Sequence, residues 1–276
     1  MGGYSTGAMG IGQERSEMRE TVDLPSSDLR HPLAGRRALI VGGSGGIGRG
    51  LARALALRGA ELFLLGGREA GRMESALAEL RSLGAGAEGR RIDLDGEIEI
   101  AEFLPDDSPF DIFAMAFGPF LQKALSETTA ADWERMLRLN LLLPGALASA
   151  LLPSMVSKRW GRMVFFGGTA TDTIRGFRTN AAYAAAKTGL GVLAKSIALQ
   201  HADDGIAAFV VCPGLVDTEY LGDRERASYS AKSPEGRLVD ANAIGETVAE
   251  LLARDPCLVS ASVISMDAGL AFARGP

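Results

Sequence analysis

The segment NAAYAAAKTGL, residues 180–190, carries Tyr183 and Lys187 four positions apart among alanines. Alanine has the highest helix propensity, so the segment predicts a helix. Positions i and i+4 of a helix share one face, with Cβ atoms about 5–6 Å apart. The phenol and the ammonium are either a catalytic pair or two ordinary side chains on an alanine-rich helix, and spacing alone leaves both open.

A glycine-rich turn comes much earlier, in ALIVGGSGGIGRGLA, residues 38–52. It lies between an apolar run and an amphipathic segment, which is the strand–turn–helix context of a dinucleotide phosphate site. Two patterns fit: G-x-G-x-x-G through Gly43, Gly45 and Gly48, and G-x-x-x-G-x-G through Gly42, Gly46 and Gly48. A merely flexible turn is the alternative, and the flanking strand and helix favour cofactor binding over it.

The end of the second apolar run reads LLGGRE, with Gly67 where an acidic residue would hold the ribose 2′-hydroxyl of NAD. Arg68 follows directly, and Arg49 adds a second positive charge after the glycine turn. Arginine accommodates a 2′-phosphate, so these residues favour NADP(H) over NAD(H). The alternative is that both arginines are solvated surface residues.

Short apolar runs alternate with longer amphipathic segments along the chain. This alternation predicts parallel strands joined by right-handed helical crossovers, and the apolar strands fit a sheet covered on both faces. The expected fold is a single doubly wound, Rossmann-type α/β domain, with a parallel sheet of about seven strands flanked by helices. The predicted strands are 36–42, 61–66, 88–94, 111–118, 161–168, 206–214 and 258–267, and the predicted helices 48–59, 69–83, 131–153, 180–203 and 241–254, with Thr129 and Asp132 capping the third.

The chain has 276 residues, of which 47% are hydrophobic and 23% charged, with a net charge of −5. This acidic balance argues against a nucleic-acid partner. Two cysteines and two histidines give no disulfide framework and no metal site, so we expect a cytoplasmic protein without a metal. The apolar stretch 140–156 is interrupted by Pro144, Gly145 and Pro153, which favours a buried helix over a membrane span. We expect residues 1–34 to form a disordered or loosely attached extension and residues 35–276 to form the folded domain.

Five segments occur in an order typical of one family: the glycine turn, RLN at 138–140, YAAAK at 183–187, CPG at 212–214 and MDAG at 266–269. Together they resemble the short-chain dehydrogenase/reductase family, especially members similar to 3-oxoacyl-carrier-protein reductases. The resemblance covers residues 35–270 and selects the Gly42, Gly46 and Gly48 pattern.

The resemblance implies that Tyr183 is the general acid/base and that Lys187 lowers its pKa and holds the nicotinamide ribose. It implies a proton-relay and helix-kinking role for Asn140. Asp93 falls where the family places an acid beside the adenine, although a helix cap fits it equally well. The implied cofactor-binding residues are Gly42, Ser44, Gly45, Gly46, Ile47, Gly48, Arg49, Arg68, Asp93, Leu94, Gly118, Tyr183, Lys187, Pro213, Gly214, Val216 and Thr218.

The sequence departs from the family at two places. The family's Asn-Asn-Ala-Gly is replaced by MAFG, residues 115–118, in which only Gly118 survives. The family's carbonyl-polarising serine has no clear counterpart: counting back from Tyr183 reaches Ala170, and counting forward from Asn140 reaches Gly168. Thr169 lies between them and keeps a hydroxyl, so we expect it to take this role, ahead of Thr171.

The expected function is NADP(H)-dependent interconversion of a carbonyl and an alcohol, on a 3-oxoacyl thioester or another small ketone. The alternative is a non-catalytic dinucleotide-binding scaffold or redox sensor, and isomerase or dehydratase chemistry is a third hypothesis. The resemblance also implies a homo-oligomer, a tetramer or dimer, built on helices 131–153 and 180–203. Candidates for the substrate pocket wall are Phe117, Phe120, Phe177 and Tyr220, beside the charged segment 217–240, which contains no large apolar lid.

Overall fold

The computed structural model describes residues 31–67, 69–96, 99–105 and 109–270. Most of the predicted N-terminal extension therefore lies outside the described residues. Leu33, which the prediction leaves in that extension, is fully buried, and its backbone N–H donates to the Arg58 carbonyl oxygen at 2.9 Å. The residues just before Gly35 thus pack on the domain.

The described residues form one sheet of seven parallel strands in the order β3-β2-β1-β4-β5-β6-β9. Val41 at the end of β1 pairs with Leu65 of β2 and with Met115 of β4, so the carboxyl ends of the strands meet at one edge. This confirms the single doubly wound domain. The strands are β1 (Arg37–Val41), β2 (Glu61–Gly66), β3 (Ala87–Arg91), β4 (Ile112–Met115), β5 (Gly161–Phe166), β6 (Ile206–Pro213) and β9 (Val263–Met266).

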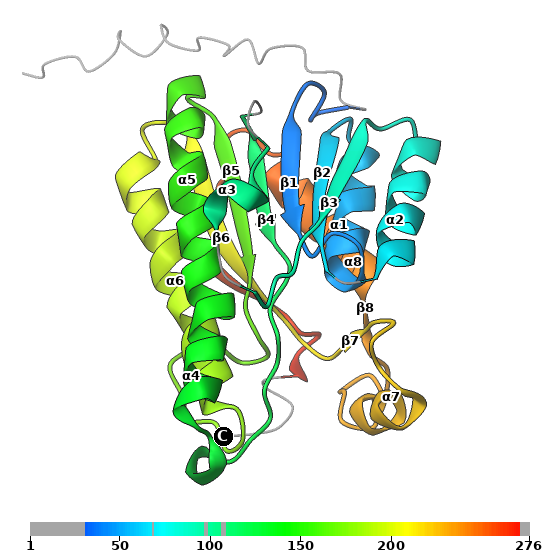
Figure 1. Ribbon diagram of the computed structural model, residues 1–276, viewed down its shortest axis with the longest axis vertical. Coiled ribbons are helices and arrows are strands. Elements are labelled where there is room, and N and C mark those ends of the chain that lie inside the picture. Colours follow the sequence, from blue (N-terminus) through cyan, green and yellow to red (C-terminus); the bar gives the residue numbers. More distant parts are fainter. Residues whose placement is uncertain (1–30, 68, 97–98, 106–108, 271–276) are drawn as a thin grey trace, which may run out of the picture.

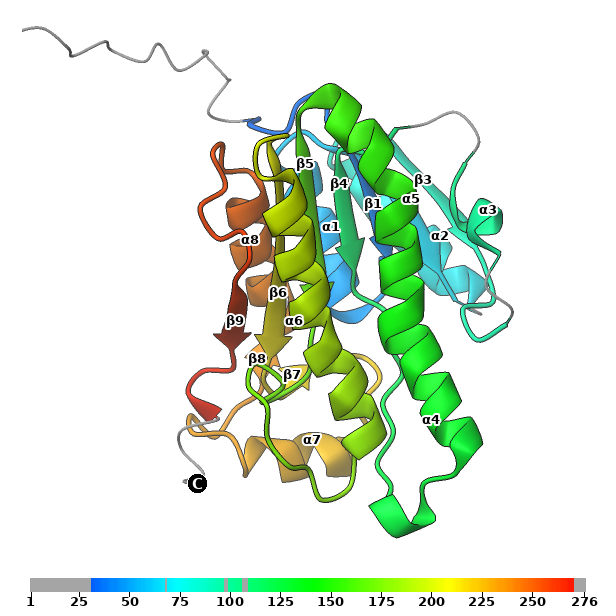
Figure 2. The same cartoon turned by 90° about the vertical axis from the view of Figure 1, so that its left-hand side faces the viewer.

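Helices cover both faces of the sheet (Figures 1 and 2). One layer contains α1 (Gly46–Ala56), α2 (Ala70–Ser82) and α8 (Ala241–Leu252). The other contains α3 (Ile100–Phe103), α4 (Ala130–Leu137), α5 (Leu143–Lys158) and α6 (Ala181–His201). Each layer has its own buried apolar cluster against the sheet. Burial on both faces explains why the central strands are almost continuously apolar.

The helix predicted over 131–153 is longer than expected and has an interruption. Thr129 and Asp132 form the predicted capping box, and a π-helical turn, η2 (Arg138–Leu142), joins α4 to α5. The predicted end at residue 153 is wrong, because the helix continues through Pro153 to Lys158 with Leu151 and Met155 packed on the sheet. Residues 130–158 are long and apolar enough to span a membrane, but they pack here as a core helix.

The segment after β6 contains structure that the sequence did not predict. A two-stranded sheet of β7 (Val216–Asp217) and β8 (Val239–Asp240) flanks α7 (Asp223–Ser230). These elements lie beyond the carboxyl ends of the large sheet (Figure 2). Helix α7 has no buried residue, so no apolar period marks it in the sequence. A short 3₁₀ turn, η1 (Leu125–Glu127), precedes α4.

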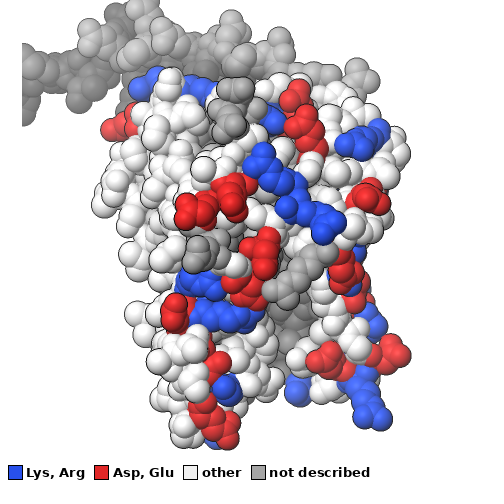
Figure 3. All heavy atoms as spheres, viewed as in Figure 1, with Lys and Arg blue, Asp and Glu red and all other residues white. Residues whose placement is uncertain are grey.

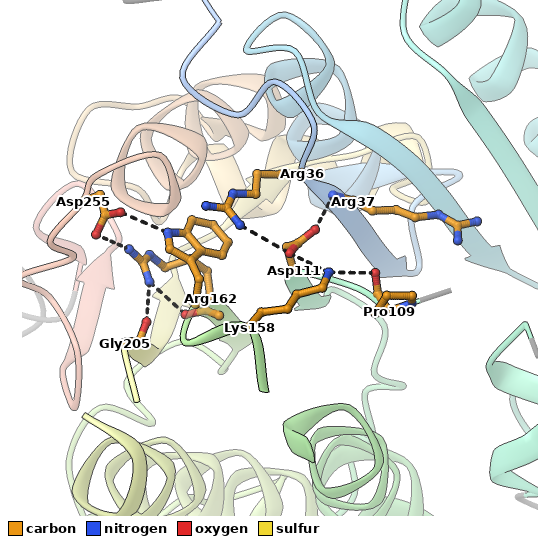
Figure 4. Close-up of polar contacts among 10 residues, drawn as sticks. Arg36, Arg37, Pro109, Asp111, Lys158, Arg162, Gly205 and Asp255 are labelled. Atoms are coloured by element: carbon orange, nitrogen blue, oxygen red, sulfur yellow. Dashed lines mark hydrogen bonds and ion pairs between the residues drawn. The ribbon is translucent and has the colours of Figure 1, made fainter. Parts of the chain in front are cut away.

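The amino edge of the sheet is held by buried charges (Figure 4). Asp111 accepts hydrogen bonds from the Arg37 backbone N–H at 2.9 Å and from Lys158 Nζ at 2.8 Å. Arg162 of β5 is 2% exposed and donates to the carbonyl oxygens of Gly161, Gly205 and Arg254. These contacts lie at the opposite edge from the glycine turn, so we assign them to stability.

Arg162→Met is expected to lower the free energy of unfolding by about 2 kcal/mol, because it fills a similar volume but leaves carbonyl oxygens without donors. Urea unfolding monitored by circular dichroism measures this change. The matched control is Arg237→Met, since Arg237 is 79% exposed and pairs locally with Glu235. Equal losses of stability in the two variants would contradict a structural role for Arg162.

Candidate active site

A cavity of about 530 Å³ opens at the carboxyl edge of the sheet, where the strand order reverses between β1 and β4. Doubly wound folds bind their ligands at this switch point. Nine of the predicted cofactor-binding residues line the cavity: Gly42, Ser44, Gly45, Gly46, Ile47, Asp93, Leu94, Gly118 and Thr218. The fold therefore brings together residues that are far apart in the sequence.

The glycine turn between β1 and α1 is closely packed. Gly42 has a φ of +86°, and a Cβ there would lie 2.9 Å from the Phe117 backbone nitrogen. Gly46 has a φ of +48°, and a Cβ on Gly48 would collide with the Gly42 carbonyl group. A side chain at Gly42 or Gly48 would thus force the backbone apart. The backbone N–H of Gly46 donates to a carboxylate, that of Glu219, at 3.0 Å, so the turn fits an anionic group such as a dinucleotide phosphate.

The positive charges near the end of β2 differ from those that the sequence favoured. Arg68 lies outside the described residues. Arg49 turns away to α2, where its guanidinium donates to Glu79 at 2.8 Å and to Ser75 at 3.1 Å. Instead Arg72, in the first turn of α2, lines the cavity with Glu69, and the two form an ion pair of 2.8 Å. Sequence reasoning missed both, although their place just after the second strand was a usable signal.

Tyr183 and Lys187 lie on α6 at the predicted offset. Lys187 is 4% exposed, and its Nζ donates to the Phe166 carbonyl oxygen at 2.7 Å, at the end of β5. The same nitrogen lies 5.9 Å from the centre of the Tyr183 ring. Phe120, one of the expected pocket-wall residues, packs edge-on against that ring at 5.0 Å between centroids. The helix thus holds a half-buried phenol beside a buried ammonium.

Burial controls the pKa values of this pair. Desolvation raises the pKa of Tyr183 and lowers the pKa of Lys187 to about 8. Lys187 directs its ammonium to the Phe166 carbonyl in this arrangement, and the expectation that it lowers the Tyr183 pKa stays a prediction. Burial thus favours the neutral form of the Tyr183 phenol, which is the form that carries a proton to donate.

Asn140 lies in the π-helical turn and is fully buried. Its Nδ2 donates to the Pro119 carbonyl oxygen at 3.1 Å, and its Oδ1 has no hydrogen-bond partner among the described residues. Gly118 separates this amide from Lys187: a Cβ on Gly118 would lie 2.6 Å from Lys187 Nζ and would overlap Asn140 Oδ1. Only glycine fits between the two polar groups, which explains why Gly118 persists in MAFG.

The loop after β5 presents Gly168, and not Thr169, to the tyrosine. A Cβ on Gly168 would lie 2.8 Å from the Tyr183 hydroxyl oxygen. The Thr169 hydroxyl instead donates to the carbonyl oxygens of Pro213 at 3.2 Å and Gly214 at 3.4 Å. Thr171 is buried, and its hydroxyl accepts from the Gly168 N–H at 2.8 Å and donates to the Gly168 carbonyl at 2.9 Å. The two threonines thus hold the loop, and the polarising role expected of Thr169 stays a prediction.

The other predicted residues divide between the wall of the cavity and its surroundings. Asp93 lines the cavity, and its carboxylate accepts from the Asp95 N–H at 3.1 Å within a turn. The helix-cap alternative for Asp93 is wrong, because the N-cap of the next helix, α3, is Glu99. Pro213 ends β6, and Gly214 packs so closely that a Cβ would lie 2.8 Å from Asp267 Cα. Val216 belongs to β7.

Of the other three residues expected in the substrate pocket wall, two line the cavity and one does not. Phe117 and Tyr220 line the cavity. Phe177 contacts the Arg175 guanidinium at 6.0 Å, outside the lining of this cavity. Within the described part of the chain, no group of three or more histidine, cysteine, aspartate or glutamate side chains is placed to hold a metal ion.

The sheet order, the glycine turn and the cavity at the switch point define a doubly wound protein of the dinucleotide-binding class. The family described as short chain dehydrogenase matches residues 36–228. The chain belongs to this family, whose members are oxidoreductases.

The chain is also similar to individual proteins over most of its length. It is 31% identical to the 3-oxoacyl-[acyl-carrier-protein] reductase FabG of Escherichia coli K12, over 86% of this chain and 97% of that protein. The Haemophilus influenzae protein of that name is also 31% identical, over 86% of this chain and 99% of that protein.

Solved structures show the same similarity. A 3-oxoacyl (acyl-carrier-protein) reductase from Agrobacterium tumefaciens C58 with NADP bound gives a TM-score of 0.77 at 28% identity, covering 89% of this chain and 99% of that one. A single-substitution variant of the actinorhodin polyketide ketoreductase with NADPH gives a TM-score of 0.75 at 27% identity, covering 85% of this chain and 97% of that one.

Proposed function

We propose that the protein is an NADP(H)-dependent oxidoreductase that interconverts a carbonyl and an alcohol. The observation that carries this proposal is the placement of Tyr183, one helical turn from Lys187, facing Gly168 beside a cavity built on a glycine turn. A phenol can protonate the alkoxide that develops when hydride reaches a carbonyl, and a buried ammonium and an anion-binding turn can hold the cofactor that supplies the hydride.

Each polar residue has one task in this scheme. Nicotinamide supplies or accepts the hydride when the cofactor is bound. Tyr183 donates the proton to the developing alkoxide, and Lys187 stabilises the phenolate that remains. Asn140, whose Oδ1 has no partner among the described residues, relays the next proton toward Lys187. Gly42, Gly46 and Gly48 provide the close backbone approach for the pyrophosphate, while Pro213, Gly214, Val216 and Thr218 border the nicotinamide side.

The preference for NADP(H) over NAD(H) has three supports. No acid stands at Gly66 or Gly67, so the ribose 2′-hydroxyl lacks the partner typical of NAD enzymes. Arg72 lines the cavity close to this point, and Arg68 adds a positive charge in the sequence. Two structurally similar proteins bear titles that name NADP or NADPH. Glu69 opposes this preference, but its charge is paired with Arg72.

A 3-oxoacyl thioester is the substrate class we propose, with other small ketones as the wider set. Its support is the name shared by the E. coli and H. influenzae relatives. The described residues add an exposed aromatic, Phe120, against the Tyr183 ring, where it can cover the carbonyl.

Titration of the purified chain with NADPH and NADH, followed by turnover on a panel of ketones and acyl thioesters, tests this function. We expect NADPH to bind at least about tenfold more tightly than NADH, since a phosphate–arginine contact contributes about 1.5–3 kcal/mol. Oxidation of NADPH should depend on a carbonyl substrate. Equal affinity for the two cofactors would contradict the preference, and tight binding of NADH alone would reverse it.

A non-catalytic dinucleotide-binding scaffold or redox sensor is the second candidate. It is favoured by Gly168 opposite Tyr183 and by Met115 and Ala116 in place of two polar residues. NADPH binding without turnover over the whole carbonyl panel would support this candidate over the reductase.

We also propose a cytoplasmic homo-oligomer, a tetramer or dimer, as the working form. Exposed apolar side chains lie along the long helices: Leu137, Leu142, Val192 and Leu199. On the face shown in Figure 3, charged side chains are sparse over α5, at the left of the view. Elsewhere on that face acidic and basic groups alternate, which does not favour a nucleic-acid partner. Light scattering in solution measures the mass of the assembly.

A further inference from the structure

The loop after β7 places a carboxylate at the amino end of α1. The backbone N–H of Gly46 donates to both oxygens of Glu219, at 3.0 and 3.2 Å. Helix α1 has no acidic residue in its own first turn, and its N-cap, Gly45, has no side chain to offer. Glu219 therefore supplies the negative charge that the helix end favours. It occupies the position where a cofactor phosphate would meet the glycine turn.

Arg72 faces the same carboxylate from α2. Its Nη1 lies 3.9 Å from Glu219 Oε1, and its guanidinium lies 4.7 Å from the centre of the Tyr220 ring. Arg72 and Gly46 line the cavity on the cofactor side, and both also line a second cavity that includes Glu219. A backbone N–H at a helix end and a guanidinium are the two kinds of donor that bind phosphate esters.

The bare Cα of Gly45 permits this contact. A Cβ at Gly45 would overlap the Glu219 carboxylate and the Tyr220 hydroxyl. The contact is also loosely packed, because the Glu219 side chain is 42% exposed and Tyr220 is 61% exposed. The two side chains can therefore leave the turn without uncovering the apolar core.

We propose that Glu219 is an internal competitor for the cofactor phosphate at the Gly46 N–H, and that Arg72, which Glu69 and Glu219 flank, is a phosphate-binding residue beside it. The inference rests on the proposed dinucleotide-binding function. Binding exchanges one anion for another at Gly46 and Arg72, so the affinity for the cofactor is set partly by the loop 218–222. The ligand chemistry is a phosphate ester, either the pyrophosphate or the 2′-phosphate.

Equilibrium titration with NADPH and NADH tests the role of Glu219 in the full chain. Glu219→Gln removes the charge, and Glu219→Ala removes the hydrogen bonds as well. We expect both variants to lower the dissociation constant of NADPH about fivefold. This change corresponds to the loss of a competing, partly exposed interaction between a charge and the helix dipole. Glu235→Gln is the matched control, since it removes an equal charge from a residue that pairs only with Arg237 among the described contacts.

Melting temperature gives a second measurement. Without cofactor, Glu219→Ala should melt lower than the wild type, because α1 loses its anion. The rise in melting temperature on adding NADPH should be larger in that variant. Unchanged or weaker NADPH binding in both Glu219 variants, or an equal gain in Glu235→Gln, would overturn the competitor role.

Arg72→Met tests the other partner and separates the two phosphates. We expect the dissociation constant of NADPH to rise about tenfold, as for the loss of a charge-assisted hydrogen bond. Equal weakening for NADPH and NADH assigns Arg72 to the pyrophosphate, and weakening of NADPH alone assigns it to the 2′-phosphate. Either result supports the proposal, and unchanged affinity, as expected for the control Arg237→Met, would overturn it.

Failure of the proposed function and failure of the Glu219 inference give different results. A wild-type chain that binds neither NADPH nor NADH contradicts the proposed function and the inference together. A wild-type chain that binds NADPH normally, with unaltered affinity in the Glu219 and Arg72 variants, contradicts the inference alone.

Discussion

Tyr183→Phe is expected to lower kcat about 10³-fold, in the middle of the range for loss of a general acid. The ring remains, so its edge-on contact with Phe120 and the packing of α6 are preserved. Only the hydroxyl that faces Gly168 is lost. NADPH affinity should stay at the wild-type value, because the variant retains the glycine turn, Lys187 and Arg72.

Steady-state kinetics with NADPH and the best substrate of the carbonyl panel, together with a binding titration, measure both quantities. The control is Tyr229→Phe, which deletes the same hydroxyl from a tyrosine of α7 whose ring contacts Lys232. If Tyr183→Phe keeps most of its turnover, another group protonates the product and the proposed mechanism is wrong.

The second large effect is expected at Gly168, in a comparison of Gly168→Ser with Gly168→Ala. In both variants the new Cβ would lie 2.8 Å from the Tyr183 hydroxyl oxygen. Because this distance is shorter than a van der Waals contact, both substitutions must displace the ring slightly. They differ only by the serine hydroxyl. That hydroxyl would point to the place where the substrate carbonyl meets Tyr183, and one such donor changes kcat about 10²–10³-fold.

We therefore expect Gly168→Ser to turn over about 10²-fold faster than Gly168→Ala. The same pair of substitutions at Gly176, where a Cβ meets no atom within 4 Å, serves as the control and should give equal rates. Equal rates for the Gly168 pair would mean that a donor is already present. In that case Thr169 would be the first residue to consider, after rotation of its hydroxyl away from Pro213.

Gly168 and Thr169 show why the departure from the family matters physically. Thr171 fixes the Gly168 peptide by accepting from its N–H and donating to its carbonyl, so the loop has a defined shape. Thr169 then points to the Pro213 and Gly214 carbonyls, which belong to the turn after β6. The chain thus uses these hydroxyl groups to hold the two loops together, and only the Gly168 backbone packs against the tyrosine hydroxyl.

The order of strands and helices along the chain was predictable from local sequence patterns. Apolar runs of strand length, separated by amphipathic segments, predicted a parallel sheet of about seven strands covered on both faces, and the structure has such a sheet with seven strands. Local patterns also predicted the Tyr183–Lys187 offset and the Thr129–Asp132 cap. These features depend on neighbours a few residues away along one helix, whose geometry is the same in any fold.

Which groups meet across the cavity depends on how distant segments of the chain pack together. Glu219 reaches Gly46 from a loop 173 residues further along the chain, and Arg72 approaches from a third element. No periodic pattern in the sequence predicts such a contact, because it depends on how β7 and α7 sit beyond the carboxyl ends of the strands. Helix α7 itself has no buried face and so left no periodic signal.

The pKa directions and the residue opposite Tyr183 were likewise beyond the sequence. Spacing places an ammonium near a phenol, but burial raises the pKa of Tyr183 and lowers that of Lys187 to about 8, and burial is a property of the whole fold. The loop after β5 has no repeating geometry, so residue counting could not choose among Gly168, Thr169 and Ala170. The backbone path of that loop made the choice, turning Gly168 toward the tyrosine and Thr169 toward Pro213.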